Sequence, residues 1–368
     1  MRRTSAQELK QLLLDEVVLP FSIAAGSGGT RGPRAAVATS VGAGLARASA
    51  FGISARPFDA LPQLHRSIAL GVAREGKEYR LAIRVQRPGL MQSALVEHLT
   101  ERAKGEVDDR LVGRIDKRAK RRRAPAGPIQ ATASIPWFQR DCRPLLIGAS
   151  VGHVDVTAGT IGGFVKRGQT VYVLSNNHVL ANEDRGRQGD WILQRARYDG
   201  GRQPGQRIGQ LRFWVRLKPK GANEVDAALA KIRDGVLHDP GTLRGLLDGD
   251  DGHLAGLGPE LVDEGRVHKV GRTTGATAGR VTAFDVDNVV VNYDAGNLRF
   301  DGQIEIEGLG QRAFSDGGDS GSLIVDEESQ AVGLLFAGSE TGGSNGLGLT
   351  YANRLHRVVQ ELKATLLF

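Results

Sequence analysis

The chain has 368 residues, of which 40% are apolar and 24% are charged, the proportions of an ordinary globular protein rather than a disordered or fibrous one. This length allows two or three domains of about 100–200 residues each. Fifty glycines, together with frequent Val, Ile and Thr runs after about residue 145, predict short strands and tight turns. We therefore expect a mainly β protein.

Cysteine content and hydropathy narrow the class further. Cys142 is the only cysteine, so no disulfide can form within the chain. Asp15 and Glu16 interrupt the apolar run near the N-terminus, so this run does not resemble a signal peptide, and no stretch of 18 apolar residues occurs. We expect a cytoplasmic protein without a membrane segment.

The net charge of +8 is unevenly placed. Residues 1–130 contain 23 Lys and Arg against 12 Asp and Glu, a net charge of +11, whereas the remainder carries 26 against 29, a net charge of −3. The larger part is slightly acidic, which weakens the hypothesis that the whole protein binds nucleic acid. A nucleic acid or an acidic partner at the basic N-terminal third remains an alternative.

Three segments precede the β-rich part. Residues 1–58 are predicted to form a helix at Ser5–Val18, begun by a Ser5–Glu8 capping box, and then a flexible segment over 22–56. Residues 59–116 indicate a small α+β (β-β-α-β) domain. Its strands are expected at Ser67–Val72, Tyr79–Val85 and Glu106–Ile115, with a helix at Leu90–Ala103.

Residues 117–140 begin with the basic run Lys117–Arg123 and continue into a Pro- and Gly-rich stretch. Such a composition predicts an exposed linker. A nucleic-acid patch and a processing site are the sharper alternatives, and the sequence leaves them open.

Residues 141–368 are predicted to form the β-rich domain. Strands are expected over Val154–Val165, Thr170–Leu174, Arg266–Val270, Gly279–Phe284, Val289–Tyr293, Gln303–Glu307, Ser322–Val325 and Ala331–Phe336. Residues 236–258 are predicted to be a connector. A final helix is expected over Arg354–Leu366, with Asn353 as its cap.

One loop in this domain carries a candidate nucleophile. Asp316-Gly-Gly-Asp-Ser-Gly-Ser322 places Ser320 between glycines, where a tight turn exposes the hydroxyl group. The amides of Gly318 and Ser320 are spaced so that both can point at one oxyanion. A surface turn has the same composition, so Ser320 is a nucleophile only if the chain supplies a base and an acid.

Two positions satisfy that condition. His178 follows the strand at Thr170–Leu174 within Ser-Asn-Asn-His-Val-Leu, at the edge of a polar turn. Asp226 heads the small apolar run Ala-Ala-Leu-Ala, where a buried carboxylate needs a strong partner such as an imidazole N–H. Taken alone, each residue is more often a structural one.

The ordered set His178, Asp226, Ser320, with Asn-Asn-His-Val, Asp-Ala-Ala-Leu and Gly-Asp-Ser-Gly around these residues, resembles the chymotrypsin/trypsin-like serine proteases. Leu174-Ser-Asn-Asn-His-Val-Leu-Ala and Lys269-Val-Gly-Arg-Thr-Thr-Gly are similar to a disulfide-free bacterial subset, related to the plant narrow-leaf protease type. The resemblance implies two six-stranded antiparallel β-barrels, a C-terminal helix and serine endopeptidase activity on a protein or peptide substrate.

The resemblance also implies residue roles. Ser320 would attack the scissile carbonyl, His178 would act as base and acid, and Asp226 would orient the imidazole, while the Gly318 and Ser320 amides form the oxyanion hole. Asp319 would be structural. Because no Ile-Val-Gly-Gly motif precedes the first barrel, an internal Arg or Lys is its expected partner.

Substrate preference is read from the same resemblance. Phe314 would lie at the base of the primary pocket with Ser315 beside it, and Phe336, Ala337 and Gly338 would form the wall that pairs with the substrate backbone. This arrangement favours a small or apolar side chain. No cofactor and no metal site is expected, since His65 and His98 lack ligand spacing.

Two other functions stay open. A protease fold with little turnover would act as a binding or scaffold protein, and the basic N-terminal third would suit a nucleic-acid-associated protein. The sequence leaves the oligomeric state undetermined. It also suggests that the N-terminal domain regulates the protease domain.

Overall fold

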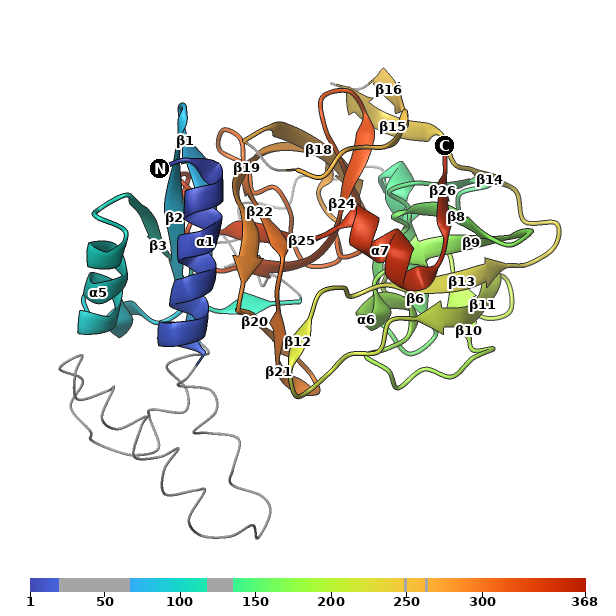
Figure 1. Cartoon of the computed structure of the whole chain (residues 1–368). Coiled ribbons are helices and arrows are strands. Elements are labelled where there is room, and N and C mark those ends of the chain that lie inside the picture. The colour runs from blue at the N-terminus through green and yellow to red at the C-terminus, as the bar shows by residue number, and fades with distance from the viewer. Residues whose placement is uncertain (20–66, 118–134, 248–249, 262–263) are drawn as a thin grey trace, which may run out of the picture.

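The computed structural model describes residues 1–19, 67–117, 135–247, 250–261 and 264–368. Strands dominate, and Figure 1 shows a small N-terminal unit beside a larger β-rich body. The helices are α1 (Arg3–Leu13), continued by a π-helical turn at Leu14–Val18, α5 (Ala94–Arg102), α6 (Asn177–Leu180) and α7 (Leu355–Leu362). Short 3₁₀ turns occur at Pro88–Leu90, Trp137–Gln139 and Arg197–Asp199.

The C-terminal half of the body is a closed barrel. Its strands are β18 (Arg266–Gly271), β19 (Gly275–Asp287), β22 (Gln303–Gly308), β25 (Leu349–Arg354), β24 (Gln330–Ser339) and β23 (Leu323–Val325). Taken in that order, each strand pairs antiparallel with the next, and β23 pairs with β18 to complete the ring. Apolar side chains from these strands, including Val267, Ile306 and Ile324, fill the interior.

The first half of the body repeats this strand order. Its path runs β8 (Gly163–Arg167), β9 (Thr170–Ser175), β13 (Ala228–Ile232), β11 (Arg207–Trp214), β10 (Trp191–Leu193) and β6 (Ser150–His153), all antiparallel. β6 then pairs with β7 (Gly159–Thr160), the short strand just before β8. A closed antiparallel barrel and a half-barrel with the same order of strand pairing confirm the expected double-barrel, mainly β fold.

Shorter strands complete the body. They are β5 (Leu145–Leu146), β12 (Ala222–Asn223), β14 (His238–Asp239), β15 (Thr242–Leu247), β16 (Asp250–His253), β17 (Gly256–Leu257), β20 (Val289–Tyr293), β21 (Gly296–Phe300) and β26 (Thr365–Leu367). Four of them lie in residues 236–258, so the prediction of a plain connector there was wrong: β15 and β16 form a hairpin, while β14 and β17 each pair with a distant strand.

Two other local predictions also needed correction. The expected strand Val154–Val165 is interrupted by a turn, because β6 ends at His153 and β8 begins at Gly163. The C-terminal helix ends at Leu362, where Lys363 adopts a left-handed conformation, and β26 then pairs with β8. Asn353 does not cap this helix, since Arg354 is the N-cap residue and Asn353 lies in β25.

The small N-terminal unit has the expected β-β-α-β order. β1 (Ile68–Glu75) and β2 (Glu78–Val85) form a hairpin, and α5 connects β2 to the parallel strand β3 (Val107–Leu111). α1 packs into the same core through Leu13 and Leu14. Its N-cap residue is Arg2 and no side chain caps it, so the Ser5–Glu8 capping box is not formed. The expected flexible segment 22–56 lies outside the described residues.

This unit extends the sheet of the C-terminal barrel. β1 pairs antiparallel with β19, so the strands of the unit and of the barrel form one continuous sheet, and Figure 1 shows β1 and β2 beside the barrel. Buried ion pairs reinforce the junction: Arg84 Nε donates to both carboxylate oxygens of Glu305 at 2.8–2.9 Å, and Lys10 Nζ lies 2.5 Å from Asp287 Oδ2. The chain then leaves β3 and enters β4 (Ile115–Asp116).

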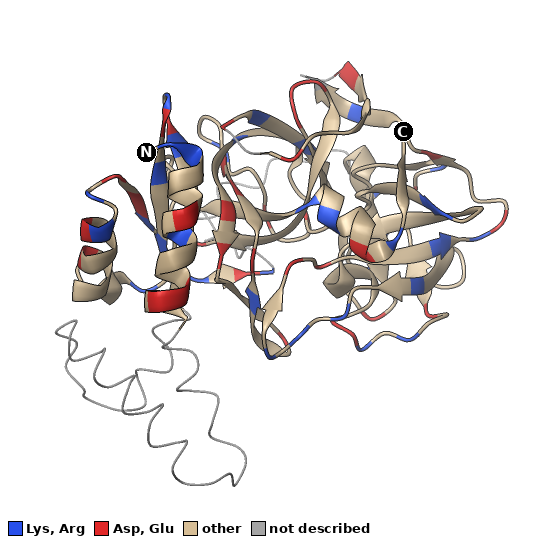
Figure 2. Cartoon of the chain, in the orientation of Figure 1, with Lys and Arg blue, Asp and Glu red and all other residues tan. Residues whose placement is uncertain are grey.

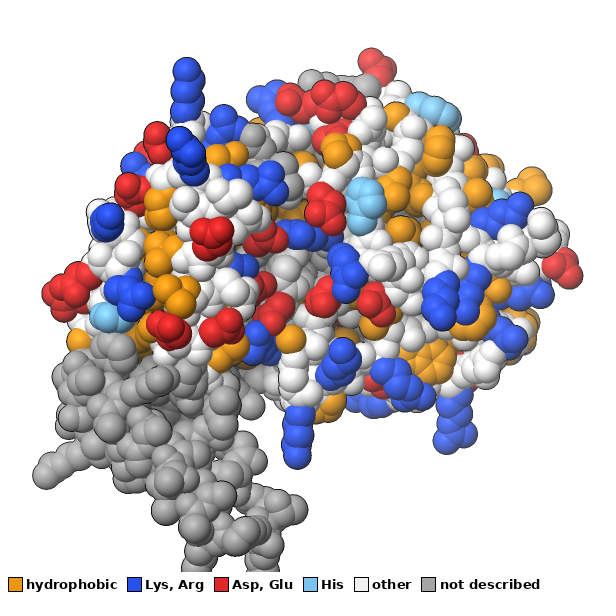
Figure 3. All heavy atoms as spheres, in the orientation of Figure 1, with side chains coloured by type: hydrophobic (Ala, Val, Ile, Leu, Met, Phe, Trp, Pro, Cys, Tyr) orange, Lys and Arg blue, Asp and Glu red, His pale blue; other side chains and the backbone are white. Residues whose placement is uncertain are grey.

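Charges of both signs cover the described surface. Figures 2 and 3 show acidic and basic side chains interspersed over the small unit. Its described residues carry 13 Lys and Arg against 11 Asp and Glu, so most of the N-terminal excess of +11 belongs to residues outside them. None of the helices in the described ranges is long and apolar enough to cross a bilayer.

Candidate active site

The loop that carries Ser320 joins β22 to β23 and depends on its glycines. Gly318 and Gly321 have φ angles of 100° and 92°, which side chains other than glycine rarely adopt. A Cβ atom on Gly318 would lie 2.5 Å from Thr273 Oγ1, so there is no room for one. The Asp319 amide donates to Asp316 O at 3.0 Å, which closes the turn. The composition of the loop thus follows from its backbone conformation.

The side chain of Asp319 points into the protein and fixes the loop through hydrogen bonds. Its carboxylate accepts hydrogen bonds from the amides of Thr273 and Thr274, from the Thr274 hydroxyl at 2.7 Å and from the Asp316 amide at 2.9 Å. Lys269 Nζ lies 3.4 Å from the same carboxylate, and both side chains are fully buried. Burial lowers the pKa of Lys269, an effect that the Asp319 charge opposes. Lys269 is therefore the internal cation that the sequence led us to expect.

His178 and Asp226 form a tightly bonded pair. His178 lies in α6, directly after β9, and Asp226 lies two residues before β13, which pairs with β9. Asp226 Oδ2 is 2.5 Å from His178 Nδ1, and Oδ1 accepts the His178 amide at 3.2 Å. The pairing of the two strands thus brings together residues 48 positions apart.

A tyrosine completes the surroundings of Asp226. Tyr293, the last residue of β20, donates its hydroxyl to Asp226 Oδ2 at 2.5 Å. Burial alone would raise the pKa of Asp226, but the imidazole and the hydrogen bonds from His178 and Tyr293 outweigh it and hold this pKa below its usual value. Burial, followed by the nearby Asp226 charge, raises the pKa of Tyr293 well above its ordinary value. Asp226 is thereby kept ionised.

Two amides fix the backbone of Asp226. The Asn353 side-chain oxygen accepts the Asp226 amide at 2.8 Å, and Asn176 Nδ2 donates to Asp226 O at 2.7 Å. Tyr293 was expected only as part of a strand, with no role in the site, and Asn353 was expected to cap a helix. Asn176 had a visible signal, since it belongs to the same motif as His178.

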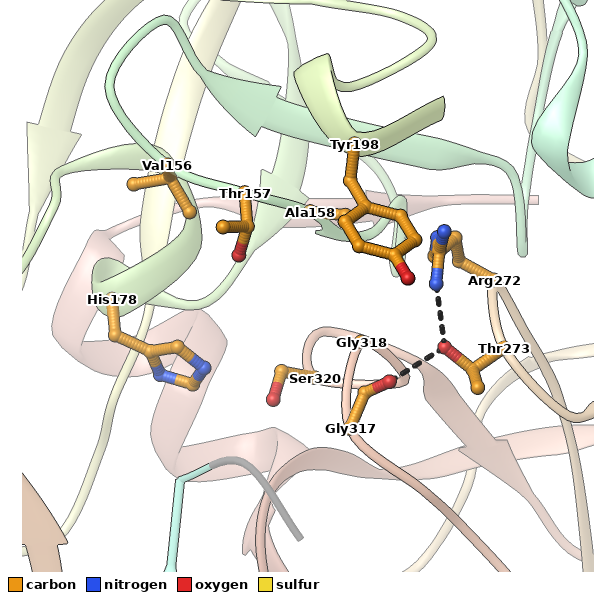
Figure 4. Close-up of a pocket in the computed structure, with 10 residues that line it drawn as sticks. All are labelled: Val156, Thr157, Ala158, His178, Tyr198, Arg272, Thr273, Gly317, Gly318 and Ser320. Atoms are coloured by element: carbon orange, nitrogen blue, oxygen red, sulfur yellow. Dashed lines mark hydrogen bonds between the residues drawn. The ribbon is translucent and has the colours of Figure 1, made fainter. Parts of the chain in front are cut away.

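His178 and Ser320 face one cavity. Figure 4 shows both side chains pointing into it, and its volume is about 320 Å³. The remaining lining residues are Val156, Thr157, Ala158, Tyr198, Arg272, Thr273, Gly317 and Gly318. Arg272 is fixed there by Asp199, whose Oδ2 accepts its Nε–H at 2.8 Å, and its guanidinium lies over the Tyr198 ring. The structure thus places Gly318 and the three candidate catalytic residues around one site.

The other side of Ser320 is occupied by the chain itself. Ser320 Oγ donates to the backbone carbonyl of Lys117 at 3.0 Å, whereas His178 Nε2 is buried and makes no hydrogen bond within the described part of the chain. β4, just before Lys117, pairs antiparallel with β24 at Gly338 and parallel with β20 at Asn292. Residues 115–116 therefore form a strand between two neighbours, and Lys117, which follows this strand, contacts Ser320.

Lys117 corrects one prediction. It was expected to begin an exposed linker, but it is buried, with 6% of its surface exposed. Its ammonium group is bonded to Glu183 and lies 3.1 Å from Asp294 Oδ2. The rest of the basic run, residues 118–123, lies outside the described residues.

The residues predicted to form the primary pocket lie outside the cavity beside Ser320. Phe314 packs in the interior of the C-terminal barrel, and Ser315 Oγ lies 2.7 Å from Thr350 Oγ1. Phe336 is buried against Phe300, with ring centroids 4.7 Å apart, and Ala337 is buried in the same cluster. None of these residues lines the cavity beside Ser320. Gly338 is the one at which the wall strand is paired, with Asp116 of this chain.

Within the described residues, no group of three or more acidic, histidine and cysteine side chains is close enough together to hold a metal ion. Cys142 is buried and unpaired, and burial raises the pKa of its thiol.

Neither a protein-family model nor a curated protein sequence matches this chain. Among solved structures, it is similar to Thermobifida fusca protease A, with 19% identity and a TM-score of 0.43 over 61% of this chain and 98% of that one. It is also similar to a chymotrypsin from Cellulomonas bogoriensis, with 18% identity and a TM-score of 0.42 over 61% and 98%. A third structure is a glutamic acid-specific serine protease that uses a histidine triad in substrate binding, with 20% identity and a TM-score of 0.44 over 61% and 100%.

These solved structures are bacterial serine proteases of the chymotrypsin type. At TM-scores below 0.5 and identities of 20% or less, the likeness carries no argument about activity. The fold of this chain is established by its own strand pairings.

Proposed function

We propose that the protein is a serine endopeptidase with His178, Asp226 and Ser320 as its catalytic residues. The observation that carries the proposal is the 2.5 Å contact between His178 and a buried, ionised Asp226, together with the cavity that the His178 imidazole shares with Ser320. Such a pair lets an imidazole take a proton from a serine hydroxyl, because the carboxylate fixes the tautomer and stabilises the imidazolium. Proteins or peptides are the proposed substrates.

The reaction then proceeds in two acyl-transfer steps. Ser320 Oγ attacks the substrate carbonyl while His178 Nε2 accepts the proton, and the imidazolium returns it to the leaving amine. The amides of Gly318 and Ser320 receive the oxyanion, and each donor of this kind accelerates catalysis on the order of 100- to 1,000-fold. Water hydrolyses the acyl-enzyme by the same proton transfers in reverse. The buried ion pair between Asp319 and Lys269 keeps the loop in the conformation that these amides need.

We further propose that the N-terminal unit regulates this activity by blocking the cleft. Residues 115–116 lie as a strand between β24 and β20, and the Ser320 hydroxyl donates to the Lys117 carbonyl instead of to His178. Because β1 continues the barrel sheet, the unit that supplies this strand is itself fixed to the body. A substrate has to displace the strand before it can reach Ser320.

We assign the protein to the cytoplasm on the grounds of its single, unpaired thiol.

The decisive measurement compares the wild-type protein with Ser320→Ala. We expect the wild type to react with a fluorophosphonate probe and to cleave casein, and the Ser320→Ala variant to do neither, because its attacking oxygen is missing. Intact-mass spectrometry of both proteins records self-cleavage at the same time. Labelling that persists in Ser320→Ala would show that another residue is the nucleophile.

A peptide-binding protein with little turnover is the second candidate. It is favoured by one contact, the hydrogen bond that holds Ser320 Oγ on the Lys117 carbonyl. A wild-type protein that neither labels nor cleaves a peptide library, but binds peptides at the cleft, would support it. A nucleic-acid-associated role rests only on the basic N-terminal third. If the protein does not bind DNA or RNA at 50 mM salt, this role is ruled out.

A further inference from the structure

We infer that Glu183, Asp294 and Tyr293 form a subsite for a basic side chain. The protease would then prefer substrates with Lys or Arg at one of the last two positions before the scissile bond. The inference rests on the proposed function and names the substrate class of that site. It differs from the sequence-based expectation of a small or apolar preference, which was read from Phe314.

The occupant of this subsite is Lys117. Its carbonyl is the hydrogen-bond partner of Ser320 Oγ, so Lys117 lies where a substrate residue near the scissile bond would lie. Its ammonium group bonds to Glu183, lies 3.1 Å from Asp294 Oδ2 and sits 5.6 Å from the centre of the Tyr293 ring. Two carboxylates and an aromatic face are the surroundings that an ammonium group favours when it leaves water.

The carboxylate of Glu183 is buried and is held in place by backbone hydrogen bonds. Its side chain is 1% exposed, and it accepts the amides of Asp294 at 3.3 Å and Ala295 at 3.1 Å, at the tip of the β20–β21 hairpin. Burying a carboxylate is costly without a cationic partner, because hydrogen bonds compensate only part of the lost hydration. Lys117 supplies that partner, with Arg185 farther away at 3.9 Å. Once a substrate has displaced residues 115–117, its own basic side chain would replace Lys117.

The backbone around Glu183 is strained in a way that suits a functional site. Asn182, Glu183 and Asp184 have successive φ angles of 48°, 55° and 64°, in the left-handed region that residues other than glycine rarely occupy. Two hydrogen bonds between Asp184 and the side chain of Asn177, the neighbour of His178, offset part of the energy cost of this conformation. Strain of this kind persists where the surroundings fix it, and it concentrates at functional sites. Here it brings a carboxylate to the edge of the catalytic site.

The test reads the subsite without any need for catalysis. In the Ser320→Ala protein, hydrogen–deuterium exchange of residues 112–117 reports how firmly this segment is held in the cleft. We expect Lys117→Met and Glu183→Gln each to accelerate exchange there on the order of 10-fold, and Lys117→Arg, the matched control, to leave it nearly unchanged. Equal exchange in Lys117→Met and in Lys117→Arg would overturn the inference, whatever the enzymatic activity.

A second arm uses the active protein and a peptide library, with the cut positions read by mass spectrometry. We expect Lys or Arg to be enriched in the last two positions before the cut, and we expect Glu183→Gln to abolish the enrichment while neutral peptides are still cleaved. Cleavage without enrichment would contradict the inference and leave the proposed function standing. Absent cleavage and labelling, together with the expected exchange pattern, would remove the proposed function and leave a subsite for basic side chains.

Discussion

At the scale of single residues, the site assigns a role to a side chain that its sequence context does not reveal. Tyr293 donates the second hydrogen bond to Asp226 Oδ2, opposite the bond to His178. In the proposed mechanism this bond stabilises the carboxylate that holds the imidazole. It also ties the β20–β21 hairpin to the catalytic residues, because Tyr293 is the last residue of β20.

Tyr293→Phe tests this role. The change keeps the ring beside Lys117 and removes only the hydroxyl, so the pKa of Asp226 should rise toward its usual value. We expect kcat on a neutral peptide to fall about 10-fold, the equivalent of roughly 1.4 kcal/mol, with KM nearly unchanged. Steady-state kinetics with Tyr172→Phe, a buried tyrosine in β9, provide the comparison. An unchanged kcat in Tyr293→Phe would mean that the hydroxyl is not needed to hold Asp226.

Catalytic candidates and their supports differ in how far they can be predicted from sequence. His178, Asp226 and Ser320 each lie in a short sequence motif, and the glycines beside Ser320 are required by the local backbone conformation. Their partners come from distant parts of the chain: Tyr293 is 67 positions from Asp226, and Lys117 is 203 positions from Ser320. No local pattern marks such contacts, because they depend on the way the strands pair.

At the scale of elements, the strands of the small unit are joined to the barrel by a buried charge cluster. Arg84 in β2 is fully buried between Glu305 in β22 and Asp108 in β3, and its Nη2 lies 2.7 Å from Asp108 Oδ2. Burial by itself would raise the pKa of Asp108, but Arg84 and Arg110 outweigh it, and the pKa lies below its usual value.

Asp108→Asn should therefore destabilise the protein in a pH-dependent way. Because the pKa of Asp108 is lowered on folding, its contribution is complete above the unfolded value of about 3.9 and is lost as the pH falls through the folded value. In the Ser320→Ala background, we expect the free energy of unfolding at pH 7 to fall by roughly 1–2 kcal/mol and the difference to shrink below about pH 4. Urea unfolding measures both.

The neighbouring exposed carboxylate provides the control for this change. Asp109→Asn, on the same strand, should alter the free energy of unfolding by less than about 0.5 kcal/mol at either pH. A difference for Asp108→Asn that stays constant from pH 7 to pH 3 would show that packing, and not the charge, is responsible.

Elements of the barrels were easier to predict than elements between them. The predicted barrel strands Arg266–Val270 and Gln303–Glu307 appear as β18 and β22, and each of them is one residue longer than expected. Residues 236–258 were predicted to be a connector because their glycines and acids are typical of turns, yet four short strands form there. β15 and β16 pair with each other as a hairpin, and β14 and β17 each pair with a distant strand. β4 is equally short, and its two residues form a strand only because β20 and β24 lie on either side.

At the scale of the whole molecule, the small unit and the β-rich body are joined in more than one place. The unit is fixed to the barrel by β1 and by the Arg84 cluster, and β4 lies between β24 and β20. The free energy that docks the unit therefore also holds residues 115–117 at Ser320. Any event that weakens β4 should raise the accessibility of the nucleophile without disturbing His178 or Asp226.

Asp116→Pro isolates this effect. Proline removes the backbone N–H at the second of the two residues of β4, which lies between β24 and β20, so β4 should pair less firmly. We expect the rate of fluorophosphonate labelling of Ser320 to rise on the order of 10-fold, since a loss of about 1.4 kcal/mol shifts the occupied cleft toward the open one. Asp116→Ala removes the same side chain but keeps the N–H, and it should label nearly as slowly as the wild type. Equal rates for Asp116→Pro and Asp116→Ala would mean that the strand does not limit access, and the N-terminal unit would then have to act in another way.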